Sequence, residues 1–244
     1  MAARGGRGWG RLALMVATAG VAVGLVPVID AAHLSHHDAF PAGGVDAAPF
    51  DVLVRSEVGT RAALGFRSDA AFVGELVVRQ RFGDPSIEMV NGFAFSKAEA
   101  TELRTRDDLR ASVIGIGNYG STQPDSYAGV YLDQASGTVV VRFTGDVARH
   151  AANLAAGFIF PERLRVTQAR WTVREMSAAS ADVIAARPVL EQLGAQVVGV
   201  SASPIDNDVL VLVTATTPEL ADYFATHFPA GLIELRVGSP ARTG

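Results

Sequence analysis

The residues that come nearest to acid–base chemistry in this 244-residue chain are Asp146 and His150. They stand four residues apart, which places a carboxylate and an imidazole on one face of a helix, and Asp133 is a second carboxylate close by in the sequence. Such a pair on a helix surface usually forms only a weak ion pair. The segment 65-GFRSD-69 also lacks the Gly-x-Ser-x-Gly pattern of a serine nucleophile. The sequence therefore predicts that the chain is not an enzyme.

Two other motifs have the composition of ligand sites. The segment 115-GIGNYG-120 matches the Gly-x-Gly-x-x-Gly turn of dinucleotide-binding proteins, which needs a strand before it and a helix after it. A predicted helix precedes it and loop residues follow, so we expect a glycine-rich connection between two domains. His33, His36 and His37 are metal-ligand types, but neighbouring histidines in a segment without periodicity are not held at fixed angles. The sequence therefore predicts no cofactor and no metal.

Composition and charge restrict the class of partner. The chain is 49% hydrophobic and 19% charged, which is typical of a globular protein. It contains no cysteine, so disulfides cannot stabilise it and we expect its stability to come from packing. Its formal net charge of −4 gives no electrostatic reason to expect nucleic acid as a partner.

The first thirty residues predict export. The basic stretch 1-MAARGGRGWGR-11 precedes 12-LALMVATAGVAVGLVPVI-29, a run without a charged residue. The run is long for the core of a signal peptide and only just long enough to span a bilayer. Residues 1–30 are therefore predicted to be a signal peptide or a membrane anchor, and residues 31–49 a flexible linker. Both alternatives place the body of the protein outside the cytoplasm, secreted or tethered to the outer face of the cell membrane.

Residues 50–126 show mainly helical patterns and predict an N-terminal subdomain. Ser68 is placed to cap a helix that extends toward Gly83. Ser96 and Glu99 form a capping-box pattern at the start of a second helix, predicted over 97–113.

The rest of the chain contains an internal repeat with an offset of seventy residues. The stretch 128-AGVYLDQASGTVVVRFTG-145 returns as 198-VGVSASPIDNDVLVLVTA-215. Each copy shows the period-two alternation of strands around a turn, and a helix and a third strand follow. Asp146 is placed to cap the first of these helices, and Pro218 stands at the start of the second.

These patterns predict an α+β fold, in which a helical N-terminal part precedes two β-β-α-β repeats that form small antiparallel or mixed sheets with helices on one face. The first repeat is predicted over 127–175, including a third strand over 164–173, and the second over 196–240. A connecting helix is predicted over 176–195, interrupted by Pro188, and 241–244 form a tail.

A small sheet with helices on one face leaves its other face and its edges available to a partner. Tyr131 and Trp171 are contact aromatics on the sheet or, alternatively, core residues, and Asp133 also has the character of a turn former. The candidate partner contacts are Tyr131, Asp133, Trp171, Arg236, Gly238 and Ser239.

The repeat resembles the pro-regions of secreted bacterial serine proteases of the alpha-lytic protease and streptogrisin type. The resemblance rests on YAGVYLDQASGTVVVRFTG, RLRVTQARWTVREM and LG-x4-GVSASPIDNDVLVLV, together with the helix opened by FSKAEATELRTRDDL, and it covers roughly residues 64–240. It implies a folding catalyst and tight inhibitor of a protease, which docks a three-stranded sheet against a protease hairpin and lays its C-terminal tail in the active-site cleft.

The chain departs from that family after 236-RVGSPARTG-244, because no trypsin-like domain with its catalytic motifs is present in it. We therefore expect a non-catalytic binding module that acts in trans on a secreted trypsin-like serine protease. The alternative is a membrane-anchored cell-surface module that binds peptide, glycan or envelope components. The oligomeric state is left open by the sequence.

Overall fold

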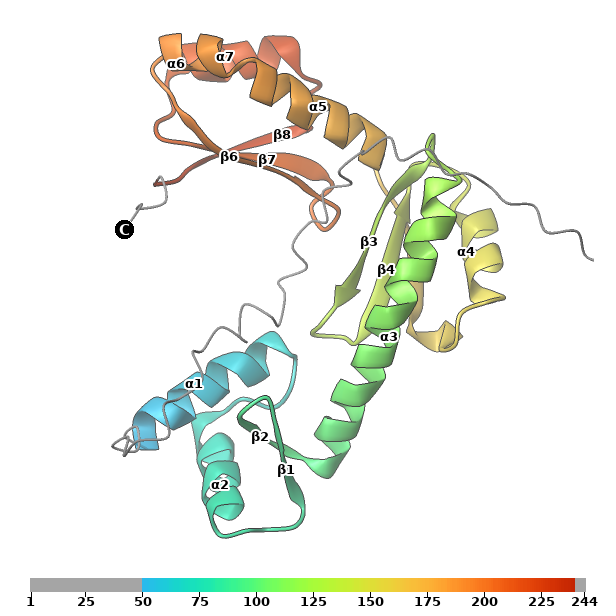
Figure 1. Ribbon diagram of the computed structural model, residues 1–244, viewed down its shortest axis with the longest axis vertical. Helices are drawn as coiled ribbons and strands as arrows, with labels where there is room; N and C mark the ends of the chain where they lie inside the picture. The colour runs from blue at the N-terminus through green and yellow to red at the C-terminus, as the bar shows by residue number, and fades with distance from the viewer. Residues whose placement is uncertain (1–49, 240–244) are drawn as a thin grey trace, which may run out of the picture.

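The computed structural model of the protein describes residues 50–239 (Figure 1). Its helices and small sheets confirm the predicted α+β class. The predicted signal peptide or anchor, the predicted linker, the histidine cluster and the tail lie outside the described residues.

The N-terminal part contains two helices and, in addition, a hairpin that the sequence patterns had not led us to expect. Helices α1 (Phe50–Ala63) and α2 (Ala70–Arg81) are followed by strands β1 (Ile87–Val90) and β2 (Phe93–Ser96), which pair antiparallel. Asn91 and Gly92 connect the strands with φ angles of 50° and 84°, the conformation of a two-residue hairpin turn. An Asn-Gly pair is itself the sequence signal for this turn, so the sequence alone could have predicted the hairpin.

The predicted cap of α2 is wrong by one residue. Asp69, and not Ser68, stands at the N-cap, where its side chain accepts a hydrogen bond of 3.0 Å from the Phe72 N–H. Its pKa is lowered because Arg67 donates to the carboxylate and the Phe72 N–H adds a second hydrogen bond. The side chains of serine and aspartate can both accept a hydrogen bond from the first turn of a helix. Local sequence alone therefore does not decide whether Ser68 or Asp69 is the N-cap.

A buried arginine holds the N-terminal part together. The Arg61 side chain is fully buried and donates to the carbonyl oxygens of Arg67 at 2.7 Å and Ala94 at 3.0 Å. It also forms an ion pair with Glu99 at the start of the next helix. Because each of its nitrogens has a partner from a different segment, the guanidinium joins α1 to the hairpin and to that helix.

Helix α3 (Lys97–Ser121) begins as predicted and ends later than predicted. The capping box is confirmed: the Glu99 N–H donates to the Ser96 hydroxyl, and the Glu99 carboxylate accepts from the Ser96 N–H at 2.9 Å. The helix continues through 115–120, so the expected glycine-rich connection is wrong. In this last part of the helix, Gly120 packs against the Tyr127 ring. A Cβ atom at position 120 would lie only 2.5 Å from the ring atoms, so glycine leaves the space that the ring needs.

The first sheet has the predicted topology. Strand β3 (Tyr127–Asp133) pairs antiparallel with β4 (Thr138–Phe143), and β4 pairs parallel with β5 (Leu164–Gln168). Helix α4 (Val147–Ala155) connects β4 to β5, and a 3₁₀ turn precedes β5. The core of this unit joins the buried face of β4 to α3 and α4 through Leu109, Ile116, Val139, Val141, Phe143 and Leu154.

Two predictions for this unit are wrong. Asp146 does not cap α4 with its side chain: its backbone is left-handed, with φ 51°, and among the described residues its carboxylate makes no hydrogen bond to the first turn of the helix backbone. The carboxylate pairs instead with Arg149 at 2.9 Å. The third strand ends at Gln168 and not at residue 173, because Thr172 starts the next helix with its own capping box.

The second sheet repeats the first. Strand β6 (Val197–Ser203) pairs antiparallel with β7 (Asp208–Val213), and β7 pairs parallel with β8 (Ile233–Val237). Helices α5 (Val173–Ala185), α6 (Arg187–Gln192) and α7 (Pro218–His227) lie on one side of this sheet (Figure 1).

The helices before each sheet belong to its core. Buried residues of α5 and α6, including Met176 and Leu190, pack with Val209 and Val211 of β7, so this segment does more than connect the repeats. The predicted interruption at Pro188 is confirmed, since the proline stands in the first turn of α6. We call the two sheets with their helices the first unit (97–168) and the second unit (173–237).

The second unit contacts the first through its hairpin turn. The Arg142 guanidinium donates to the carbonyl oxygens of Pro204 at 3.0 Å and Ile205 at 2.7 Å. Gly129, with φ 116°, lies so close to Pro204 that a Cβ atom would approach its ring to 2.6 Å. Asn207 in the same turn accepts from the backbone N–H groups of Arg170 and Trp171, at 2.7 and 2.9 Å. The turn is thus bonded both to the first sheet and to the segment between the units.

Candidate binding surface

Strand β8 forms an outer edge of the second sheet. The strand order is β6-β7-β8, and no further strand among residues 50–239 pairs with β8. The Val209 N–H donates to the Leu232 carbonyl, and the Gly238 N–H donates to the Val213 carbonyl. Because backbone groups alternate along a strand, the even-numbered residues of β8 bond to β7. The N–H and C=O groups of Ile233, Leu235 and Val237 therefore point away from the sheet.

The face of the second sheet opposite its helices carries partly exposed leucines, and we call it the open face. Leu210 and Leu212 lie on this face, because they alternate with Val209 and Val211, which are fully buried against the helices. Both leucines are only partly buried. At the matching place on the first sheet, Val140 is 1% exposed. The open face is therefore a property of the second unit.

Acidic residues border this open face. Asp208 stands at the start of β7, and its buried Oδ1 atom has no hydrogen-bond partner in the part of the chain that the structure describes. Burial raises the pKa of Asp208, and the neighbouring carboxylates of Asp206 and Glu234 raise it further. The face thus combines apolar residues with an acidic end near the turn.

Three predicted contact residues lie at this edge. Arg236 on β8 is 57% exposed in its side chain and pairs with Glu234 at 2.8 Å, which raises the pKa of Arg236. Gly238 continues the pairing with β7 and rests near the side chains of Leu212 and Val198. Ser239 follows as an exposed residue. The structure thus brings Arg236, Gly238 and Ser239 together beside the open face.

The other three lie elsewhere. Tyr131 on β3 pairs with Val140, on the face of the first sheet that the second unit partly covers. Asp133 organises the first hairpin turn: its carboxylate accepts from Ala135 and Ser136, and the Ser136 hydroxyl is the main cause of its lowered pKa. Trp171 was expected on the third strand, but it follows β5 and packs on the core of the second unit. These three residues do not share a surface with the β8 edge.

Asp146 and His150 do not form an acid–base pair. His150 is fully buried, with its ring stacked on Phe143 at 3.8 Å between centroids. Its Nδ1 atom lies 2.8 Å from the Tyr119 hydroxyl and its Nε2 atom 3.3 Å from the Ser126 hydroxyl. Burial lowers the pKa of His150, the positive charge of Arg149 lowers it further, and Asp146 opposes both. The predicted placement of this histidine on the helix surface is wrong.

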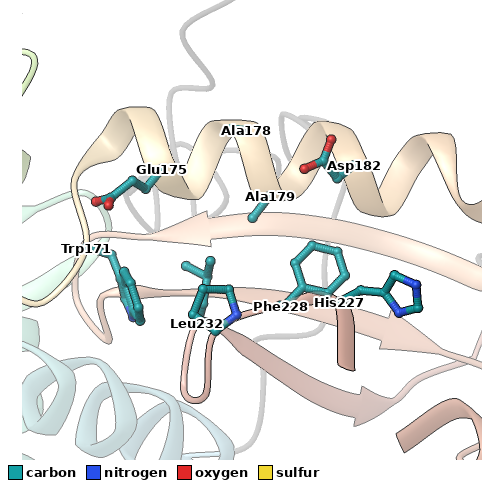
Figure 2. Close-up of a pocket in the computed structure, with 9 residues that line it drawn as sticks. Trp171, Glu175, Ala178, Ala179, Asp182, His227, Phe228 and Leu232 are labelled. Atoms are coloured by element: carbon teal, nitrogen blue, oxygen red, sulfur yellow. The ribbon is translucent and has the colours of Figure 1, made fainter. Parts of the chain in front are cut away.

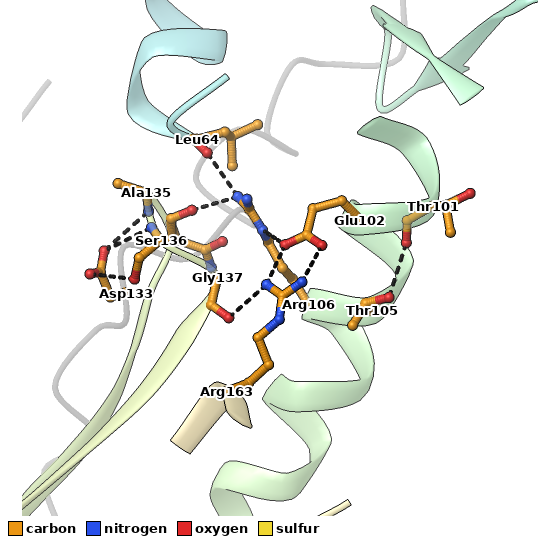
Figure 3. A network of polar contacts seen from close by, with 11 residues as sticks. Leu64, Thr101, Glu102, Thr105, Arg106, Asp133, Ala135, Ser136, Gly137 and Arg163 are labelled. Atoms are coloured by element: carbon orange, nitrogen blue, oxygen red, sulfur yellow. Dashed lines mark hydrogen bonds and ion pairs between the residues drawn. The ribbon is translucent and has the colours of Figure 1, made fainter. Parts of the chain in front are cut away.

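A polar network fixes the first hairpin turn to α3 (Figure 3). Arg163 makes two hydrogen bonds to the Glu102 carboxylate, at 2.7 and 2.8 Å, and these bonds lower the pKa of Glu102. Arg106 bonds to the same carboxylate and donates to the carbonyl oxygens of Gln134 and Leu64. Every charged group of this network is paired within the chain, so its role is structural.

Comparison with known proteins found no match: no family model, curated protein or solved structure is similar to this chain. Within residues 50–239, no three His, Cys, Asp or Glu side chains are grouped so as to hold a metal ion. The same residues include no helix with the length and apolar character that crossing a membrane requires.

The arrangement at the edge of the second sheet is suited to binding an extended chain. The outward backbone groups of β8 can pair with a strand, and the adjacent face offers apolar side chains. Sequence reasoning identified this region through Arg236, Gly238 and Ser239, but missed Leu210 and Leu212. Their alternation with buried valines was the available signal.

Proposed function

We propose that the chain is an exported, non-catalytic binding module that pairs strand β8 with an extended segment of a secreted trypsin-like serine protease. The observation that carries the proposal is the outer edge of β8, with which no further strand of residues 50–239 pairs. This edge presents the backbone groups of Ile233, Leu235 and Val237. An exposed edge of this kind is a template for strand addition, because main-chain hydrogen bonds supply affinity without a particular partner sequence.

The open face beside the edge supports the same proposal. Leu210 and Leu212 lose further contact with water when a partner covers them, and apolar burial contributes about 25 cal/mol per Å². The class of partner comes from the resemblance of the repeat to protease pro-regions. In that arrangement the segment after Val237 follows the paired edge toward the cleft of the protease.

The experiment combines the purified chain with a streptogrisin-type protease expressed without its own pro-region. The protease is unfolded and diluted into buffer with or without the chain, and recovered activity is measured with a peptide substrate. In parallel, the folded protease is titrated with the chain. We expect faster recovery in the first assay and inhibition in the second. Unchanged recovery together with unchanged activity of the folded protease would contradict the proposal.

A proline at Val237 tests the strand-pairing geometry. Val237 is 63% exposed, and its N–H points away from the sheet, so Val237→Pro removes an outward donor without removing a hydrogen bond to β7. Val237→Ala keeps the donor and shortens the side chain. We expect Val237→Pro to raise the inhibition constant at least tenfold and Val237→Ala to change it less than threefold, since about 1.4 kcal/mol corresponds to a factor of ten. Equal effects of the two variants would show that backbone pairing at this edge is not used.

A further inference from the structure

A groove lies on the helix side of the second unit, away from the open face. Helix α5 forms one wall, and the segment from Phe228 to Leu232 forms the other (Figure 2). Trp171 stands at one end of the groove. Ala178 and Ala179 contribute only methyl groups from α5, and the short side chains leave the space open. The groove is therefore walled by aromatic and aliphatic surface.

The carboxylates at the rim are hydrogen-bond acceptors. Glu175 and Asp182 line the groove from α5. One Glu175 oxygen accepts from Thr172, and within residues 50–239 neither the other oxygen nor the Asp182 carboxylate has a hydrogen-bond partner. The third polar side chain, His227, donates from Nδ1 to the Tyr223 carbonyl at 2.8 Å.

The nearby indole donor and the nearby cation already have partners within the chain. The Trp171 indole N–H donates to the Gly231 carbonyl at 3.3 Å, and among residues 50–239 no lysine or arginine lines the groove. Arg170, outside the groove, places its guanidinium carbon 4.7 Å from the centroid of the Trp171 ring. This indole therefore already takes part in one cation–π contact. A ligand that fits these walls must bring its own donors and positive charge.

The size of the groove limits which cationic group can fit into it. Its volume of about 220 Å³ is smaller than the roughly 300–1,000 Å³ of pockets for whole small molecules. It matches a single long side chain with an apolar stem and a cationic end. Arginine suits it best, because a planar guanidinium stacks on aromatic rings and donates to carboxylates at once.

We propose that this groove, lined by Trp171, Phe228 and the carboxylates of Glu175 and Asp182, binds an arginine side chain of a peptide or protein partner. The guanidinium lies between the rim carboxylates and the indole, and the aliphatic stem covers Ala178 and Ala179. This site is separate from the β8 edge and does not depend on the identity of the partner proposed above.

The test uses the full chain with Trp9→Phe, which leaves Trp171 as the only tryptophan. N-acetyl-arginine methylamide is titrated at constant ionic strength while indole fluorescence is recorded, and N-acetyl-citrulline methylamide is the uncharged, nearly isosteric control. We expect a saturable change in fluorescence with the arginine probe and none with the citrulline probe. An equal response to both probes, or no saturable response to either, would overturn the proposal.

Two matched variants locate the site. Asp182→Asn removes a rim carboxylate that has no partner within the described residues, and Asp222→Asn removes an exposed carboxylate of α7 outside the groove. We expect Asp182→Asn to raise the Kd of the arginine probe about two- to fivefold, as for an exposed ion pair, and Asp222→Asn to leave it unchanged. Ala178→Leu fills the groove and is expected to abolish the response. A wild-type response in Ala178→Leu, or equal Kd values for the two asparagine variants, would overturn the assignment to this groove.

Discussion

The first and second units share the β-β-α-β order, but matching positions hold different kinds of side chain. With the offset of seventy residues, buried His150 of the first unit corresponds to buried Leu220 of the second. Arg142, which holds the turn of the second unit, corresponds to Leu212, which lies on the open face. The order of strands and helices therefore depends on the size of the side chains and on the alternation of buried and exposed positions. The polar residues that differ between the units decide which surface of each unit makes contacts.

The turns show the same principle. Gly137 and Asn207 occupy matching positions with φ angles of 62°, a conformation that suits glycine and asparagine. The glycine admits the side chains of Glu102, Arg106 and Arg163, which a Cβ atom would meet at 2.6 to 3.0 Å. The asparagine instead uses its side chain to bond the segment between the units. The same backbone position thus makes room for a network of charged side chains in the first unit. In the second unit it binds the segment that connects the two units.

The largest difference between the units is expected in their cores. Phe143 and Val213 match, and both are fully buried, but Phe143 also contacts the rings of Tyr119, Tyr127 and His150. Phe143→Ala is expected to lower the free energy of unfolding by about 3–5 kcal/mol, and Val213→Ala by about 2 kcal/mol. Urea unfolding followed by circular dichroism measures both values. Equal losses would show that the aromatic cluster adds nothing to the first unit.

The second prediction concerns pH. Because the pKa of His150 is lowered in the folded state from 6.5, the unfolded chain binds more protons between the folded pKa and about 6.5. The free energy of unfolding is therefore expected to decrease as the pH falls through this window. His150→Leu, which copies the second unit, should reduce that dependence, at a cost near pH 8 of about 1–2 kcal/mol from the lost hydrogen bonds.

Urea titrations between pH 8 and pH 5 measure this effect, and His227→Gln is the control because His227 is exposed. The control should keep the wild-type slope. A slope in His150→Leu as steep as that of the wild type would mean that His150 does not carry the pH dependence.

The smallest change in the free energy of unfolding is expected when the first hairpin turn is given the residue types of the second. In the first turn the Ser136 hydroxyl donates to Asp133, and in the second the Ser203 hydroxyl donates to Asp206, so the two residue types are interchanged. The double variant Asp133→Ser with Ser136→Asp should change the free energy of unfolding by less than about 0.5 kcal/mol. Asp133→Ala alone should cost about 1 kcal/mol, because two backbone N–H groups lose their acceptor. Thermal unfolding compares the two, and a larger loss in the double variant would show that the turns are not equivalent.

Local patterns predicted much of the fold correctly. The alternation around Val139 and Val209 indicated both hairpins, because a strand with one buried face must repeat every second residue. The pair Ser96 and Glu99 indicated the start of α3. The end of α3 was missed, because glycines at 115, 117 and 120 disfavour a helix locally, while packing of Ile116 and Tyr119 on the first sheet favours it.

The candidate surface was predicted only in part. Arg236 and Gly238 were identified from their place at the end of the repeat, but Trp171 was assigned to a strand that ends before it. The groove beside Trp171 joins α5 to the segment after α7, about fifty residues further along the chain. No local pattern relates those two segments, so only their packing on one sheet reveals the groove.

The sequence by itself determined the units: apolar spacing, turn residues and caps act over a few residues, and they specify the strands and helices and the repetition of the fold. The tertiary structure decided what each unit exposes. Contacts between segments far apart in the chain decide whether Arg142 donates to a carbonyl oxygen and whether His150 is buried. Such contacts also decide whether the outer edge of β8 is covered. Those contacts arise from packing geometry and desolvation, which single-residue patterns do not encode.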